Sequence, residues 1–86
     1  MIIPRVHWNG TSREELLKQL HDATAAVSDA ITAMAKATPH GRDYYIISHE
    51  ATKQAQDEHY ARMNKLHEVV QDLIRITEGV AEQRKR

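Results

Sequence analysis

The residues best suited to chemistry lie in a short segment, 38–47, between two long stretches of helical pattern. Behind a Pro/Gly break, this segment places Arg42 and Asp43 directly before the adjacent tyrosines Tyr44 and Tyr45. A connector between two helices needs only a few polar residues, so aromatic rings here need an explanation. A ring can stack on a flat partner while a guanidinium pairs with phosphate. The segment therefore predicts a site for a flat, anionic ligand.

The predicted site extends into the start of the second helical stretch. His49 and Lys53 are four residues apart and would share one face of a helix that begins beside the segment. Backbone N–H groups at a helix N-terminus favour anions. In this hypothesis Arg42 and Lys53 pair with phosphates, and His49 or Asp43 reads polar edges. The predicted ligand-binding residues are Arg42, Asp43, Tyr44, Tyr45, His49 and Lys53. The alternative interpretation is a solvated helix face with loop tyrosines that cap the core.

Other kinds of chemistry find little support in the sequence. No nucleophile, base and orienting group form a recognisable catalytic set, and no glycine-rich phosphate loop is present, so we expect no enzyme. None of the six histidines has a second histidine four residues away, which argues against a metal site, and no cofactor is expected. His59 and His67 flank Met63 on an apolar pattern, so we expect them to be buried or boundary residues.

Capping and breaking residues define the elements that would position the site. Thr11 with Glu14 and Ser12 with Glu15 have capping-box spacing, and the residue before Pro39 is disfavoured in a helix. The expected elements are an arm over 1–10, a helix over 12–37, a loop over 38–47, a helix over 48–83 capped by Ser48, and a basic tail over 84–86.

Apolar residues recur along both predicted helices in alternating steps of three and four, which predicts two helices packed along a seam. The seam residues are Leu17, Leu20, Thr24, Val27, Ile31, Met34 and Thr38 in the first helix, and Met63, Leu66, Val70, Leu73, Thr77 and Val80 in the second. The predicted fold is all-α: an antiparallel two-helix hairpin with an extended N-terminal arm.

The apolar surface exceeds what a two-helix hairpin can cover. Beside the first seam runs a stripe of alanines, and the second helix carries additional apolar residues. These are Ala23, Ala26, Ala30, Ala33 and Ala37, and Val69, Ile74, Ile76 and Ala81. The arm, with Ile2, Ile3, Val6 and Trp8, could lie along the longer second helix. A chain of 86 residues has a small core of its own, so we expect a homo-oligomer.

Composition limits the partners and the compartment. Twelve basic and twelve acidic residues cancel, so no global field attracts nucleic acid or an acidic membrane, and sequence-specific DNA binding is not expected. The chain has no cysteine, no signal-peptide pattern and no apolar run of about 18 residues, so the expectation is a soluble protein in the cytoplasm of a host cell, without membrane contact.

Two segments together resemble a group of short phage and prophage proteins. These are Asn9-Gly10-Thr11-Ser12-Arg13-Glu14-Glu15-Leu16 and Pro39-His40-Gly41-Arg42-Asp43-Tyr44-Tyr45. The group tends to show Asn-Gly-x-Ser-Arg-Glu-x-Leu, a first helix, an Asn-Gly-Arg-Asp-Tyr-Tyr loop and a charged second helix. Here His40 stands where that group often has asparagine, and Ile46-Ile47-Ser48 replaces a more polar, proline-containing continuation. In size and helical plan the chain is also similar to phage anti-defence proteins that trap cyclic nucleotide signals between subunits.

The leading functional hypothesis is therefore a non-enzymatic anti-defence sponge that sequesters a nucleotide-like immune signal, such as a cyclic nucleotide or an ADP-ribose-type molecule, between subunits. The alternative is a protein–protein module, a phage adaptor or inhibitor that docks a host protein through the Arg42–Tyr45 loop or the face of the second helix. Tyrosine and arginine suit both, so composition does not separate them. Tyrosines in a concave pocket would favour the small ligand, and tyrosines on a convex tip would favour the protein. A structural or packaging component is the third possibility.

Overall fold

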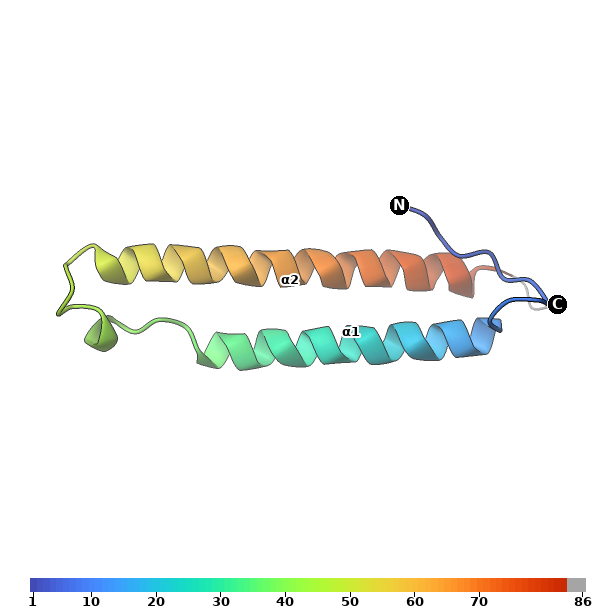
Figure 1. Ribbon diagram of the computed structural model, residues 1–86, viewed down its shortest axis with the longest axis horizontal. Coiled ribbons are helices and arrows are strands. Elements are labelled where there is room, and N and C mark those ends of the chain that lie inside the picture. The colour runs from blue at the N-terminus through green and yellow to red at the C-terminus, as the bar shows by residue number, and fades with distance from the viewer. Residues whose placement is uncertain (84–86) are drawn as a thin grey trace.

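The computed structural model describes residues 1–83 and contains two long helices that pack against each other. Helix α1 spans Arg13–Lys36 and helix α2 spans Ala51–Ala81, with a single 3₁₀ turn, η1, at Gly41–Asp43 between them. The described part of the chain contains no strand, so the predicted all-helical class is confirmed. Figure 1 shows the two helices side by side, with the connector at one end of the pair and the N-terminal arm at the other.

Helix α1 begins where the capping pattern predicts. The Ser12 hydroxyl accepts a hydrogen bond from the Glu15 backbone N–H at 3.1 Å, and acidic side chains occupy the first turn. The helix ends at Lys36, with Ala37 as its C-cap, two residues before Pro39. Ser12 and Ala37, the limits of the predicted range, are therefore the two caps.

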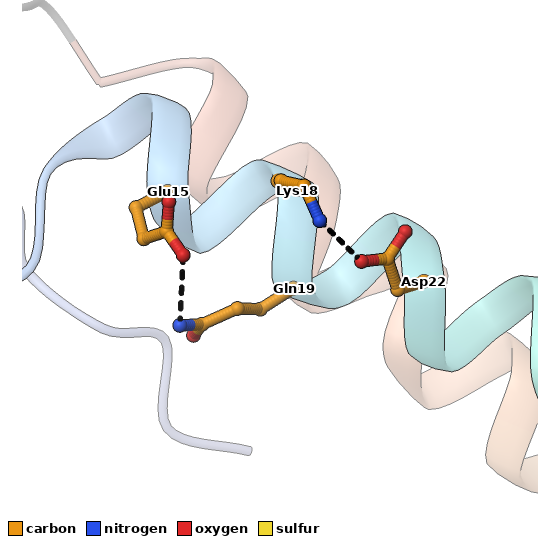
Figure 2. A network of polar contacts seen from close by, with 4 residues as sticks. All are labelled: Glu15, Lys18, Gln19 and Asp22. Carbon is orange, nitrogen blue, oxygen red and sulfur yellow. Dashed lines mark hydrogen bonds and ion pairs between the residues drawn. The ribbon is translucent and has the colours of Figure 1, made fainter.

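The outer surface of α1 is polar and locally bonded. Lys18 pairs with Asp22 at 2.8 Å, and the Gln19 side chain donates to Glu15 at 3.4 Å (Figure 2). The hydrogen bond to Asp22 raises the pKa of Lys18 above its usual value. Such exposed pairs four residues apart contribute little to stability, because solvent and salt screen the charges. The packing of the other face therefore has to account for the stability of the pair.

Helix α2 begins three residues later than predicted, at Ala51 instead of Ser48. The chain makes a turn first, in which the Ile47 N–H donates to the Tyr44 carbonyl at 2.9 Å. Glu50 occupies the N-cap position and makes no side-chain capping bond. The predicted start at Ser48 is wrong because the chain is still turning there. At the other end α2 stops at Ala81, two residues short of the prediction, and the predicted basic tail lies outside the described residues.

The two helices meet along the predicted seams, where every residue is half-buried or buried. Near one end of the pair, the Arg13 guanidinium donates to the Ala81 carbonyl at 2.5 Å. Near the other end, His59 of α2 hydrogen-bonds the Met34 carbonyl of α1 at 2.8 Å. Among the described residues, Val80 is the one apolar side chain that is fully buried. The seam therefore forms a thin line of contact, and it does not enclose a core.

The N-terminal arm lies against the last turn of α2. The Gln83 side chain accepts from the Val6 N–H at 2.7 Å and donates to the Pro4 carbonyl at 2.6 Å. Gly79 makes room for Ile3, since a Cβ at position 79 would lie 2.7 Å from the Ile3 side chain. Ile2 and Trp8, however, are 93% and 85% exposed. The arm thus covers α2 with only part of its apolar surface.

The molecule is a rod with a large surface for its mass. Its extents are 62 × 20 × 17 Å, and it exposes 6711 Å². A typical monomer of 9.9 kDa exposes about 5,200 Å², so this chain exposes about 1,500 Å² more. Neither α1 nor α2 is long and apolar enough to cross a membrane.

Candidate functional site

The connector between the helices is a sequence of tight turns. The Arg42 N–H donates to the His40 ring at 3.1 Å, and the Tyr44 and Tyr45 N–H groups both donate to the Gly41 carbonyl. These local bonds use the backbone polar groups of the connector within the connector itself. Of the side chains that follow η1, that of Tyr44 is half-buried, and those of Tyr45, Ile46 and Ile47 are exposed.

The six predicted ligand-binding residues lie near this end, but the structure does not join them into a site. Arg42, Asp43, Tyr45 and His49 are exposed, and Tyr44 is half-buried. No hydrogen bond, ion pair or ring contact connects any two of the six residues. The chain alone therefore presents them separately on its surface.

The ammonium group of Lys53, predicted to bind phosphate, already has a partner. It pairs with Asp57, one turn further along α2, at 2.8 Å, and this hydrogen bond raises the pKa of Lys53. Both side chains are well exposed, so the pair is weak and an anion could compete for the lysine. A phosphate at this position would nevertheless approach the carboxylate of Asp57.

The prominent feature of this end is a row of three large apolar side chains. The first of them, Tyr45, was predicted from the sequence as a site residue, and the other two were missed. Tyr45, Ile46 and Ile47, which we call the tip, are 70%, 77% and 69% exposed. Two consecutive β-branched residues in a connector, where polar residues are usual, are the sequence signal that could have identified them. Contiguous exposed apolar side chains of this kind mark interaction surfaces.

The tip rests on a fixed base. The Gln56 side chain donates to the Pro39 carbonyl at 3.1 Å and so holds the connector against α2. His59 is 6% exposed, and the Tyr60 ring lies edge-on to it at a centroid distance of 6.2 Å. The predicted burial of His59 is confirmed, whereas His67 is exposed. His59 therefore links α2 to the end of α1 as a structural residue.

Hollows in the surface occur elsewhere along the rod. One of about 260 Å³ lies at the arm end, lined by residues that include Val6, Trp8 and Arg13. A second, of about 220 Å³, opens on the side of the helix pair beside Ile74. Neither is lined by a tip residue. Within residues 1–83, no group of three or more histidine, aspartate or glutamate side chains is placed to hold a metal ion.

No protein-family model, curated protein or solved structure matches this chain. The resemblance to short phage proteins therefore stays a prediction from the sequence.

Proposed function

We propose that this chain is a non-enzymatic protein-interaction module that acts in the cytoplasm of a host cell. In this proposal an antiparallel helical hairpin presents the tip to an apolar groove on a partner protein. The observation that carries the proposal is the exposure of Tyr45, Ile46 and Ile47, each about 70% or more, on the outer end of a rod. Side chains that project outward fit a concave protein surface better than they enclose a small molecule.

The surroundings of the tip suit such a partner. Arg42 and Asp43 precede it and His49 and Glu50 follow it, so charges of both signs surround an apolar centre. Protein interfaces share this arrangement, with an apolar, aromatic-rich centre and a polar rim. The hydrogen bond from Gln56 to Pro39 and the buried His59 hold the base of the connector, which limits the ordering cost on binding.

The competing proposal is the sponge for a nucleotide-like signal such as a cyclic nucleotide or an ADP-ribose-type molecule. It is supported by the exposure of both Arg42 and Tyr45, three residues apart in the connector, which leaves a guanidinium and a ring free to engage phosphate and base. It requires a second subunit to complete the pocket. A thermal-shift panel of cyclic nucleotides tests it, because a ligand at 100 times its Kd adds about 2.7 kcal/mol to stability.

We also propose that the chain self-associates. It exposes about 1,500 Å² more than a typical monomer of its mass, whereas a standard interface buries about 800 Å² on each partner. Self-association along the side of the rod would leave the tip free, so the two proposals are compatible.

The docking proposal is tested by site-specific crosslinking. A photo-reactive side chain at Ile47, in extract of the cells that carry the gene, should give one discrete adduct with another protein. A matched probe at Arg75, an exposed position on α2 away from the tip, should not give it. Excess unlabelled chain should compete for the adduct, and the triple variant Tyr45→Ser, Ile46→Ser, Ile47→Ser should not.

Two results would overturn the docking proposal. In one, no adduct forms at Ile47 although the chain is folded. In the other, the triple variant competes as well as the wild type. A strong thermal shift with one nucleotide, lost in both Arg42→Ala and Tyr44→Ala, would establish the sponge instead.

A further inference from the structure

The seam between the two helices has a gap, which lies at Thr24 of α1 and Thr77 of α2. Thr24 and Thr77 are seam residues at which the two helices carry a small side chain instead of leucine, isoleucine or methionine. Each hydroxyl donates to the carbonyl four residues earlier in its own helix at 2.7 Å, so neither hydroxyl bridges the seam. Beside them the surface opens into a hollow of about 220 Å³. Its lining residues are His21, Thr24, Ile74, Thr77 and Glu78.

A partly exposed apolar side chain is among those that line the same hollow. Ile74 lies three residues before Thr77, on the same side of α2, and is 36% exposed. The patch therefore contains both a hole and an apolar group that could fill a hole of this kind. His21 and Glu78 add a hydrogen-bond donor and a carboxylate to its rim.

We infer that this patch is the contact between two copies of the chain. Across a two-fold axis, Ile74 of each copy enters the hollow of the other, and the partner copy's Glu78 meets His21. Such an interface is isologous, because one patch that carries both knob and hole is complementary to itself. The assignment deepens the self-association proposed above and does not depend on the tip.

Area and charge support a second copy as the occupant. Because the rod as a whole exposes about 1,500 Å² more than a typical monomer of its mass, a contact along its side, centred on the hollow, has room for the roughly 800 Å² per partner that a standard interface buries. The formal net charge of the chain is +0 at pH 7, so two copies meet without long-range repulsion. Among the described residues Val80 is the one fully buried apolar side chain, so such a contact would add to the small apolar burial within a single copy.

Substitutions at Thr24 distinguish a dimer that forms through this hollow from non-specific association of apolar surfaces. Thr24→Leu fills the hollow with atoms of the same chain, so the helix pair should remain folded while its dimer weakens at least tenfold. Thr24→Val keeps the shape of the hollow and should leave the dimer constant within about twofold. Sedimentation equilibrium of the full chain measures both constants, and circular dichroism checks the helix content.

Substitutions at exposed positions of α2 provide a second, independent test. Ile74→Ser should weaken the dimer at least tenfold, whereas Val69→Ser, which removes an apolar side chain that is 43% exposed but outside the hollow, should not. A dimer that withstands Thr24→Leu and Ile74→Ser but dissociates on Ala26→Glu would overturn the inference and move the interface to the alanine stripe. A chain that stays monomeric when its concentration in the centrifuge is raised 100-fold would overturn self-association itself. The tip variant should leave the dimer intact.

Discussion

One side chain, that of Gln83, holds the N-terminal arm by its backbone. Its amide accepts a hydrogen bond from the Val6 N–H and donates one to the Pro4 carbonyl. It therefore bonds the main chain of the arm through one acceptor and one donor, as a neighbouring β-strand would. The same amide nitrogen also lies 3.3 Å from the Gly79 carbonyl. Gly79 in turn lets Ile3 approach α2 more closely than any residue with a Cβ would allow. The arm is thus attached at a few identifiable atoms.

Gln83→Ala should release the arm. Two hydrogen bonds of about 1 kcal/mol each are lost, so docking of the arm should weaken by about 2 kcal/mol. Hydrogen exchange at the Val6 amide should speed up, while exchange along the middle of α2 stays unchanged. Gln83→Glu, which keeps the acceptor for Val6 and loses the donor to Pro4, should give an intermediate rate. Equal rates in all three proteins would mean that the side chain does not hold the arm.

Residue types alone predicted the burial of His59 and the caps of α1, but not the exposure of the tip. His59 lies on the apolar pattern, and its spacing identifies its face. Ile46 and Ile47 carry apolar side chains, which are usually buried. The neighbouring sequence does not indicate that these two side chains are left uncovered. The six predicted site residues make no hydrogen bond, ion pair or ring contact with one another, although Arg42 and Asp43 share the turn η1, because shared location at one end of the chain does not fix where the side chains point.

At the scale of elements, the two helices begin in different ways. Helix α1 starts with a serine whose hydroxyl bonds the N–H three residues on, and acidic residues follow in its first turn. Helix α2 has neither a side-chain capping bond nor an acidic residue in its first turn. The beginning of α2, directly behind the tip, is therefore the less stable of the two helix starts.

Two serine substitutions compare these starts directly. Ser12→Ala should lower the free energy of unfolding by about 1 kcal/mol, because it removes the cap of α1. Ser48→Ala should change it by no more than a few tenths, about 0.3 kcal/mol, since Ser48 caps nothing. Urea denaturation followed by circular dichroism measures both values. A larger loss for Ser48→Ala would show that α2 begins at Ser48 in solution, as the sequence predicted.

The boundaries of α1 could be predicted because its signals are local: a capping serine at one end and Pro39 at the other. The start of α2 could not, because Ser48 has the right residue type in a backbone that is still turning after Ile47. The difference lies in backbone geometry that four or five residues of sequence do not specify.

At the scale of the whole molecule, the chain is a thin rod with unsatisfied apolar surface at both ends and on its side. Met1, Ile2 and Trp8 are exposed at the arm end, and the tip residues are exposed at the other. Half-burial along the seam was predictable from the steps of three and four. The amount of surface left uncovered depends on how two rods of unequal length meet, which the spacing does not give.

The thermal midpoint of the wild-type chain should therefore depend on its concentration. If the folded form associates and the unfolded form does not, a 100-fold increase in concentration should raise Tm by about 5 °C or more. Differential scanning calorimetry over this range provides the measurement. A midpoint that does not move would indicate that the single pair of helices is the stable unit. Thr24→Leu, the variant that fills the side hollow, should reduce the dependence.

The single tryptophan, Trp8, belongs to the arm at one end of this rod, whereas Tyr44 and Tyr45 belong to the connector at the other end and Tyr60 to the first third of α2 (Figure 1). About 21 residues of helix separate Tyr60 from Ala81, which lies between the arm's contacts at Gly79 and Gln83, a distance of roughly 32 Å at 1.5 Å per residue. Within one copy, fluorescence energy transfer from tyrosine to Trp8 is therefore inefficient. Emission from Trp8 in excess of what its own absorption at the exciting wavelength gives would instead report the tyrosines of a neighbouring copy lying near this arm. The unmodified chain thus carries its own optical signal for the direction in which two copies pack.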